Sequence, residues 1–361
     1  MARRSRRRPF VVIAAVAALV LLLAACGGND DRVDQPAAVD GVEATEAGAH
    51  VIATTTILAD ITRNIACEEV AVDTLMSPGQ DPHTFELSAR HAAELREADL
   101  VVANGLGLEE SLEDVLLDAQ ADGTTVVFLG EHVQPIPFTG AEHGDDEHSE
   151  EEHVEDEPAD EEHAEDEHAG EKHADEKHSE EEPAHGSLDP HVWMDPARMA
   201  IASAHLAEEL TRATGTDHAE CATTYIDSLR QLDSELAALL ETIPADKRKL
   251  VTNHEALGYL ADSYGFEIIG VVIPGGSTTA QPSAADIVQL AETLDRETVS
   301  AIFAETTAPT QLADLVASET STDIEIVSLY TGSLGEPGTE AETYIQMMRT
   351  NADRIAAALT K

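Results

Sequence analysis

Three histidines outside any histidine-rich run are the residues of this chain best suited to bind a metal ion. Two of them close copies of one tripeptide, Asp81-Pro82-His83 and Asp189-Pro190-His191. The third, His254, stands where an apolar run gives way to a predicted helix, and the carboxyl ends of strands are where open α/β sheets hold ligands. Proline fixes its own φ and restricts the residue before it, so each tripeptide presents its histidine from a stiff loop.

Neutral imidazole is a common metal ligand, and the aspartate of each tripeptide is a candidate acceptor for the ring nitrogen that does not bind metal. A single histidine of this kind is more often a structural or surface residue. The repeated tripeptide and the strand-end position of His254, taken together, favour a metal site over that alternative.

The segments around these histidines alternate between predicted strands and predicted helices. Strands are predicted at residues 50–55, 70–76, 100–103, 124–129, 250–252, 267–272, 299–304 and 324–329. Helices are predicted at 57–66, 88–98, 195–214, 217–242, 255–264, 282–294, 311–318 and 344–359. Such alternation is typical of parallel sheets. We therefore predict an α/β protein whose two parallel-sheet lobes are joined by one long helix that ends before Pro244.

The first residues are predicted to be an export signal. Arginines at positions 3, 4, 6, 7 and 8 precede an apolar run at 10–23, which is too short to span a bilayer comfortably. The run ends in Leu23-Ala24-Ala25-Cys26, which resembles a bacterial lipobox with Cys26 as the lipidated residue. The alternative is an ordinary secretory signal with a chance cysteine, and a faint twin-arginine pattern leaves the export route open.

These patterns also give the domain boundaries. We predict a lipoprotein signal peptide at 1–25, a flexible tether at 26–48, an N-terminal lobe at 49–216 with an insert at 142–187, an interlobe helix at 217–243 and a C-terminal lobe at 244–361. Export leaves two further cysteines, Cys67 and Cys221, and an oxidising compartment permits one disulfide between them. Two unpaired buried thiols are the alternative.

The insert at 142–187 combines acidic residues with histidines on a five-residue period. These are His143, His148, His153, His163, His168, His173 and His178. A step of five residues turns a helix by about 140°, so the imidazoles would not share a helix face, and the composition predicts disorder. Imidazole and carboxylate both bind metals, so we predict an auxiliary, low-affinity metal chelator. A plain acidic spacer is the alternative.

The charge balance limits the partners. The chain carries 71 Asp and Glu against 21 Lys and Arg, a formal net charge of −50. That charge argues against binding to nucleic-acid phosphates or to an anionic membrane surface. We expect no nucleic-acid partner, and we expect a monomer that is held to the membrane by its lipid anchor.

Several motifs resemble those of the zinc and manganese solute-binding proteins of ABC importers. They lie at residues 79–86, 188–196, 253–260, 304–306 and 344–349, so the resemblance covers the chain from about residue 50 to its end. It implies two α/β lobes bridged by a rigid helix, with the metal in the cleft between them. It also implies His83, His191 and His254 as ligands, and a receptor on the outer face of the cytoplasmic membrane that hands its cargo to a permease.

The metal and its fourth ligand follow in part from this resemblance. Manganese members usually carry Glu at the place of His254, so a third imidazole favours Zn²⁺ over Mn²⁺, in agreement with the preference of manganese for oxygen. The family often supplies an Asp in the turn after the last strand, where this chain has Gly332. Water, Glu305 or a group from the insert then remains for the fourth position, although Glu305 is more readily a carboxylate that orients a ligand, or a purely structural one.

Two functions of other classes compete with a zinc receptor. Three histidines and a water also form the site of zinc hydrolases, but the chain has no His-Glu-x-x-His motif, because Ala256-Leu257-Gly258 follows His254-Glu255. A surface adhesin or zinc-storage lipoprotein, in which the insert does the main work, is the other alternative. We expect no enzymatic activity.

Overall fold

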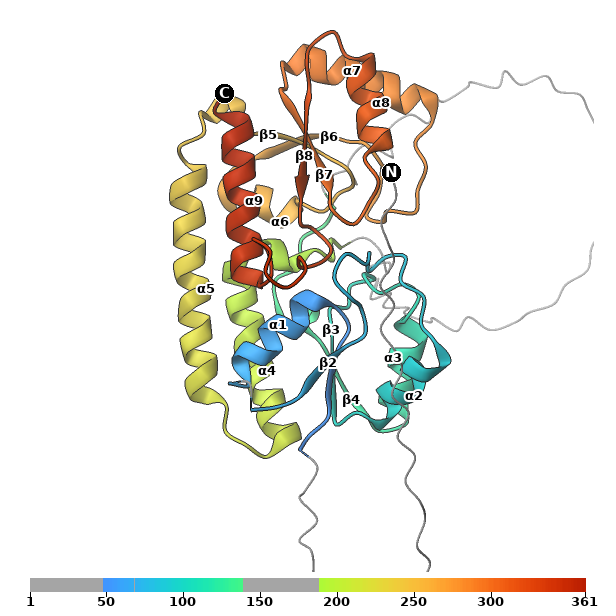
Figure 1. Ribbon diagram of the computed structural model, residues 1–361, viewed down its shortest axis with the longest axis vertical. Coiled ribbons are helices and arrows are strands. Elements are labelled where there is room, and N and C mark those ends of the chain that lie inside the picture. The colour runs from blue at the N-terminus through green and yellow to red at the C-terminus, as the bar shows by residue number, and fades with distance from the viewer. Residues whose placement is uncertain (1–47, 68, 139–187) are drawn as a thin grey trace, which may run out of the picture. The chain divides into compact units, whose positions relative to one another are not determined.

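The first lobe is built on a four-stranded parallel sheet (Figure 1). The computed structural model describes residues 48–67, 69–138 and 188–361. The strands are β1 (Val51–Ala53), β2 (Val72–Thr74), β3 (Leu100–Ala103) and β4 (Thr125–Phe128), in the order β2-β1-β3-β4. All neighbours pair in parallel, as the alternation of strands and helices predicts.

Helices cover both faces of this sheet. They are α1 (Thr56–Ile65), α2 (Ala89–Glu97), α3 (Glu113–Ala121) and α4 (Pro196–Thr214). Along β3, Val101 points into the core that contains Leu95 and Leu116 of α2 and α3, whereas Leu100 and Val102 point into the core shared with α1 and α4. Because both faces are covered, β3 is an uninterrupted apolar run.

The second lobe repeats this plan. Its strands are β5 (Lys249–Thr252), β6 (Glu267–Val271), β7 (Ala301–Glu305) and β8 (Glu325–Leu329), in the order β6-β5-β7-β8 and all parallel. Its helices are α6 (Gly258–Tyr264), α7 (Ala284–Glu297), α8 (Gln311–Glu319) and α9 (Tyr344–Leu359). The predicted fold class, two parallel-sheet α/β lobes, is therefore confirmed.

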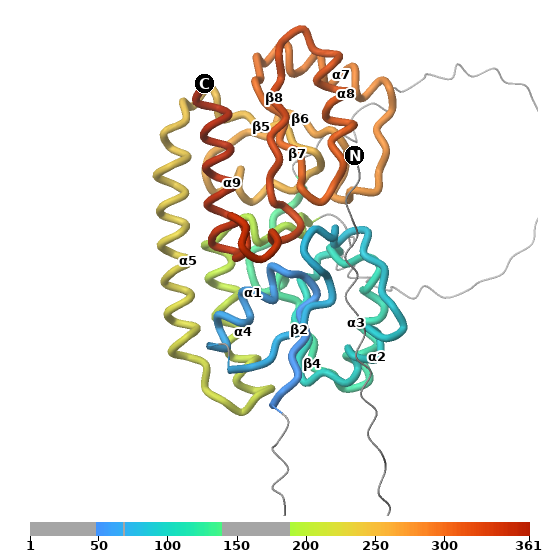
Figure 2. Tube along the Cα trace, viewed as in Figure 1, coloured from blue at the N-terminus to red at the C-terminus, as the bar shows by residue number. Residues whose placement is uncertain are grey.

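The long helix α5 (Ala219–Leu240) lies between the two sheets in the sequence and runs along the side of both lobes (Figures 1 and 2). It packs against α1 and α4 of the first lobe and against α9 of the second. Its buried face includes Ile226, Leu229, Leu232 and Leu236, at the spacing of three and four that predicts a helix with one apolar side. One continuous hydrophobic core runs through these helices and joins the lobes.

Two predicted helix starts are confirmed by their caps. The Ser88 hydroxyl accepts a hydrogen bond from the backbone N–H of His91 at the start of α2. The Asp195 carboxylate accepts from the N–H groups of Ala197 and Arg198 at the start of α4, whose first residue is Pro196. Both caps satisfy N–H groups that have no partner within the helix.

Three predicted helix starts are too early. Helix α5 begins at Ala219 and not at 217, and helix α7 begins at Ala284 and not at 282. Helix α6 begins at Gly258 and not at Glu255. The His254 carbonyl accepts the Thr252 hydroxyl at 2.6 Å and the Ala256 N–H at 2.8 Å, so the chain makes a tight turn there before it becomes helical. Helix α3 was not expected from the sequence, and no side-chain cap marks its beginning at Leu112.

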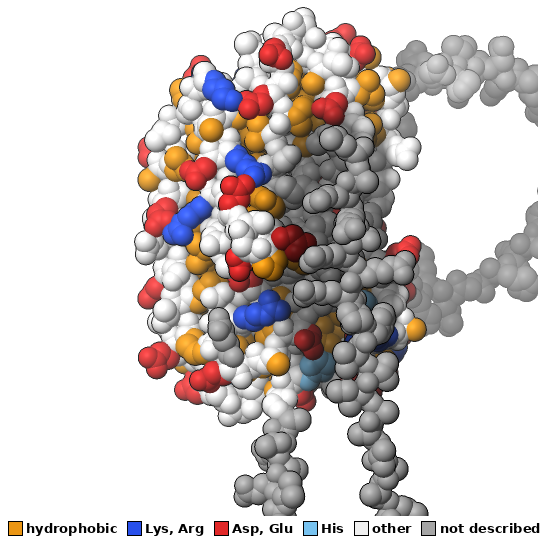
Figure 3. Space-filling model, viewed as in Figure 1, with side chains coloured by type: hydrophobic (Ala, Val, Ile, Leu, Met, Phe, Trp, Pro, Cys, Tyr) orange, Lys and Arg blue, Asp and Glu red, His pale blue; other side chains and the backbone are white. Residues whose placement is uncertain are grey.

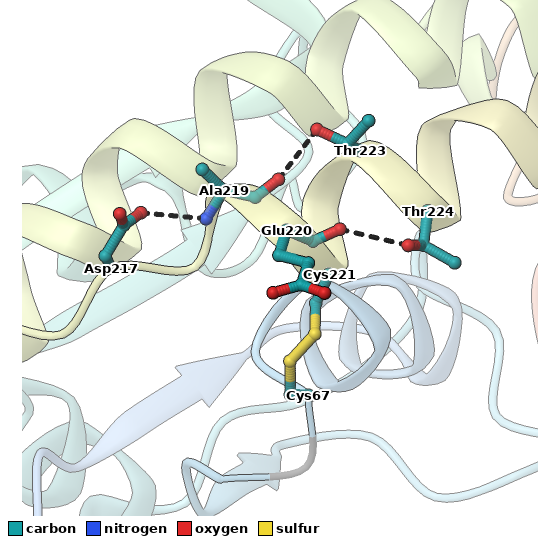
Figure 4. The surroundings of a disulfide bond; sticks show 7 residues. All are labelled: Cys67, Asp217, Ala219, Glu220, Cys221, Thr223 and Thr224. Atoms are coloured by element: carbon teal, nitrogen blue, oxygen red, sulfur yellow. Dashed lines mark hydrogen bonds between the residues drawn. A yellow bond between two sulfur atoms is a disulfide. The ribbon is translucent and has the colours of Figure 1, made fainter.

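A disulfide joins Cys67, just after α1, to Cys221 in the first turn of α5 (Figure 4). It links residues 154 positions apart and attaches the start of α5 to the first lobe. At the opposite end of α5, Arg349 of α9 contacts Glu235 at 2.7 Å. That ion pair is exposed and contributes little to stability, so the buried apolar face of α5 holds α9.

The visible face of the protein carries acidic side chains over both lobes, with Lys and Arg among them (Figure 3). Among the residues that the structure describes, no helix has both the length and the apolarity to cross a membrane. The predicted signal peptide, tether, lipidated Cys26 and histidine-rich insert lie outside the described residues.

Candidate metal centre

The three predicted histidines come together where the two lobes meet. His83 lies in the loop between β2 and α2, His191 lies at the start of the short 3₁₀ turn η3 (Val192–Met194), and His254 follows β5. Their exposed fractions are 5%, 1% and 2%. One candidate ligand atom from each lies within 4.8 Å of the other two, and no other such group of His, Cys, Asp and Glu occurs among the described residues.

The Nε2 atoms of these rings converge at distances that suit one ion. His191 Nε2 lies 3.2 Å from His83 Nε2 and 3.0 Å from His254 Nε2. Two nitrogens of a tetrahedral zinc site, each about 2.0–2.1 Å from the ion, are about 3.3–3.4 Å apart. The observed separations therefore need only a small expansion to hold a zinc ion.

Asp189 orients the His191 ring. Its Oδ1 lies 2.7 Å from His191 Nδ1 and also accepts the His191 backbone N–H at 2.9 Å. A carboxylate at Nδ1 selects the tautomer with its proton on that nitrogen, which leaves the Nε2 lone pair free for a metal. Asp189, the first residue of the second tripeptide, thus orients the histidine of that tripeptide, as the sequence predicts.

Glu305, the last residue of β7, stands in the same relation to His254. Its Oε1 is hydrogen-bonded to His254 Nδ1, and both side chains are almost fully buried. The three-histidine group of candidate ligand atoms does not include Glu305. This carboxylate therefore contacts the outer nitrogen of a candidate ligand, which is the orienting position and not the ligand position.

The first tripeptide behaves differently from the second. Asp81 accepts the backbone N–H of His83 at 3.0 Å, but its other oxygen accepts the hydroxyl of Thr278 in the second lobe at 2.6 Å. His83 Nδ1 is buried and has no hydrogen-bond partner among the residues that the structure describes. The two copies share a sequence and the hydrogen bond from the histidine N–H to the aspartate, yet only Asp189 contacts the ring of its histidine.

Burial and neighbouring charges separate the pKa values in the cluster. Burial, helped by the other two histidines, lowers the pKa of His83 to about 3 and holds that of His191 well below its ordinary value. Burial acts to lower the pKa of His254, but the Glu305 carboxylate, together with Asp81 and Asp189, outweighs it and the pKa is raised. Burial raises the pKa of Asp189 to about 7. Two of the rings are therefore neutral, as metal ligands must be.

Gly332 lies beside the cluster, in the turn after β8. A Cβ placed on it would lie 3.0 Å from Pro82 Cδ and 3.6 Å from Thr307 Oγ1, and its φ is not in the left-handed region. The position therefore faces the loop that carries His83. A side chain fits there only if Pro82 moves by a few tenths of an ångström.

The loop of His191 also depends on residues that the sequence did not single out. Glu109 is buried and accepts hydrogen bonds from the Thr54 hydroxyl and from the backbone N–H groups of Asn104 and Gly105. Asn104 in turn donates its side-chain amide to the Pro190 carbonyl at 2.8 Å. The available signal was the polar Asn104 directly after the buried strand β3, at the edge of the sheet where ligands bind.

Two parallel-sheet lobes with a shared, buried cluster of imidazoles define a two-lobed metal-binding receptor. A family model described as zinc-uptake complex component A, periplasmic (ZnuA) matches residues 51–358. The chain belongs to this family, as its motifs predict. Members are solute-binding proteins of metal ABC transporters and not enzymes, and this chain is a metal-binding component of that kind.

Individual relatives agree with this assignment. The chain is 27% identical to the zinc-binding protein TroA of Treponema pallidum and 28% identical to the manganese-binding lipoprotein MntA of Bacillus subtilis; each match covers 86% of this chain and 89% of the relative. The solved structure of the Treponema pallidum zinc-binding protein superposes with a TM-score of 0.69 at 26% identity, over 87% of this chain and 99% of that one.

Proposed function

We propose that this protein captures one zinc ion outside the cytoplasmic membrane, with His83, His191 and His254 as ligands, and delivers it to an ABC-transporter permease. The observation that carries the proposal is the convergence of three buried Nε2 atoms at 3.0 and 3.2 Å around His191. A water or a mobile group takes the fourth position. Lipidation of Cys26 would keep the receptor at the membrane, close to the permease.

The choice of zinc over manganese rests on the donor atoms. Imidazole nitrogen suits zinc, whereas manganese prefers carboxylate, carbonyl and water oxygens. The two buried carboxylates that contact the cluster, Asp189 and Glu305, are hydrogen-bonded to the Nδ1 atoms of His191 and His254. The names of the two relatives divide between zinc and manganese, so the donor set is the stronger argument.

The test is elemental analysis of the purified mature protein, followed by competition between zinc and manganese. We expect one tightly bound zinc per chain and displacement of manganese by an equal concentration of zinc. A protein with all three histidines changed to alanine is the control and should lose this site. Undiminished tight zinc binding by that control, or a preference for manganese, would contradict the proposal.

A further inference from the structure

The carboxylate that orients His191 is packed against a glycine of the second lobe. A Cβ placed on Gly258, the first residue of α6, would lie 2.3 Å from Asp189 Oδ2 and 3.5 Å from Asp189 Cγ. Heavy atoms that are not bonded do not approach so closely. Any side chain at position 258 must therefore displace Asp189 or the start of α6.

Asp189 has little freedom to move away. Its exposed fraction is 1%, and its Oδ1 is held by two nitrogens of His191. Its backbone N–H donates to the Ile136 carbonyl at 2.8 Å, and its own carbonyl accepts the hydroxyl of Tyr259 at 2.7 Å. A displaced carboxylate would lose the hydrogen bond to His191 Nδ1, because the main chain on either side is fixed.

The backbone gives no other reason for glycine at this position. The φ of Gly258 is not in the left-handed region that favours glycine, and alanine is the better helix former. The space that the Asp189 carboxylate occupies is what excludes a side chain. The segment that contains Gly258 also contains His254. One stretch of the second lobe therefore provides one candidate ligand and also restricts the position of Asp189, which orients the candidate ligand His191.

We propose that Gly258 is a positioning residue for metal binding: by leaving room for the Asp189 carboxylate, it fixes the His191 ring with its Nε2 lone pair toward the ion. This inference rests on the proposed function, because it takes His191 as a ligand. It assigns Gly258 no contact with the metal. The residue acts through Asp189, and through Asp189 on His191.

The experiment compares zinc affinity in Gly258→Ala and in the wild-type protein. Loss of an orienting contact typically weakens metal binding about 10- to 100-fold, and we expect a loss in this range. Gly270→Ala is the matched control, since it is a glycine of the same lobe whose added Cβ would meet only the tip of the flexible Leu290 side chain, at 2.4 Å. The control should bind zinc as the wild type does.

A double-mutant cycle identifies the contact. In an Asp189→Ala background the carboxylate is gone, so adding Gly258→Ala should cost no further affinity. Independent, additive losses would overturn the inference. If Gly258→Ala alone does not fold, the double variant should fold, because the collision has been removed. Failure of both to fold would show that the added methyl group collides with something else.

A spectroscopic measurement separates this inference from the proposed function. The nitrogen chemical shifts of the His191 ring in metal-free protein report whether the proton is on Nδ1, and Gly258→Ala should shift this signature while Gly270→Ala should not. A wild-type protein that binds no zinc would refute the proposed function and leave this readout intact. Tight zinc binding by the wild type with an unchanged signature and affinity in Gly258→Ala would refute the inference alone.

Discussion

At the scale of single residues, two carboxylates help to determine which groups of the histidine cluster bind protons. Asp189 and Glu305 each contact the Nδ1 of one histidine, whereas the Nδ1 of His83 has no partner within the described parts of the chain. The raised pKa values in the cluster belong to Asp189 and His254, and the lowered ones to His83, His191 and Glu305. Zinc binding must therefore displace protons from specific groups and not from all three histidines.

We predict that zinc affinity falls as the pH drops, with a coupling of two protons. His254 takes up a proton because its pKa is raised above 6.5, and Asp189 does so below about 7, where the neutral carboxyl group is a weaker acceptor for His191 Nδ1–H than the carboxylate. Both must be unprotonated in the zinc complex, whereas His83 with a pKa of about 3 is already neutral. The slope of log affinity against pH should approach two below about pH 6.

Titration calorimetry in buffers of different ionisation enthalpy measures the protons released. Asp189→Asn is the control, because its amide oxygen still accepts from His191 Nδ1 but does not titrate, so its slope should fall to one. A slope above two in the wild type would mean that His83 or His191 also titrates, which would contradict their lowered pKa values.

A second prediction at this scale concerns Gly332. We expect Gly332→Asp to bind zinc more tightly than Gly332→Ala, because both side chains crowd Pro82 equally while only Asp offers a charged oxygen. Sparing the entropy of a held water contributes at most about 2 kcal/mol to this gain, or about thirtyfold, in addition to the contribution of the charge. Zinc competition assays on both variants and on Glu305→Gln decide the matter. Equal affinity of the two Gly332 variants, with a loss in Glu305→Gln as large as in a histidine variant, would instead place Glu305 in the fourth position.

The repeated tripeptide pointed to His83, His191 and Asp189, and the end of a predicted strand pointed to His254. The sequence did not separate the roles of the two tripeptide copies. Asp81 contacts Thr278, which is 197 positions away, whereas Asp189 contacts its own histidine. The packing of Asp189 against Gly258 is equally remote in the sequence. Contacts of this kind depend on how two lobes meet, and a local pattern carries no information about that.

At the scale of elements, the boundaries that the sequence predicted best are those with local causes. Helix α9 and strand β3 begin and end where apolar periodicity and apolar runs predict. Helix α6 differs because hydrogen bonds to the His254 carbonyl hold a turn before it, and these involve the same segment that presents the candidate ligand. The prediction of this helix start from the sequence therefore fails at the candidate site, where the requirements of function compete with those of regular secondary structure.

We predict that the disulfide between α1 and α5 contributes to stability and not to metal affinity. It closes a loop with a sequence separation of 154, and loops of this size confine the unfolded chain strongly. Cys67→Ser together with Cys221→Ser should lower the free energy of unfolding by about 2–4 kcal/mol. Denaturant unfolding with and without a reductant measures this, and the double variant should be insensitive to the reductant. A loss of zinc affinity in the variant would show that α5 also positions the cluster.

At the scale of the whole molecule, neither lobe holds the candidate site alone. The first lobe supplies His83 and His191, and the second supplies His254. The hydroxyl of Thr56 in α1 accepts the backbone N–H of Leu334, and the carboxylate of Asp60 accepts that of Tyr344. One buried and one partly buried hydrogen bond therefore cross between the lobes near the shared core. The position of one lobe relative to the other therefore sets the geometry of the imidazoles.

The last prediction concerns the histidine-rich insert at 142–187, which lies outside the described residues. The chain on its two sides is already joined, because Pro137 and Leu188 form an antiparallel bridge and the Asp189 N–H donates to the Ile136 carbonyl at 2.8 Å. A short Gly-Ser linker in place of the insert should therefore leave the loop of His191 intact. We expect this variant to keep one tight zinc site and to lose the weaker ones that the period-five histidines provide.

A zinc titration followed by calorimetry measures the tight site, and equilibrium dialysis measures the weak sites. The matched control is a full-length chain in which the seven periodic histidines and His185 are changed to serine, which keeps the length and the acidic charge while removing the imidazoles of the insert. If this serine variant still binds the additional zinc ions weakly, the carboxylates of the insert bind those ions. If either variant loses the tight site, a group from the insert completes the coordination of the ion held by His83, His191 and His254, and the fourth position is not filled by water.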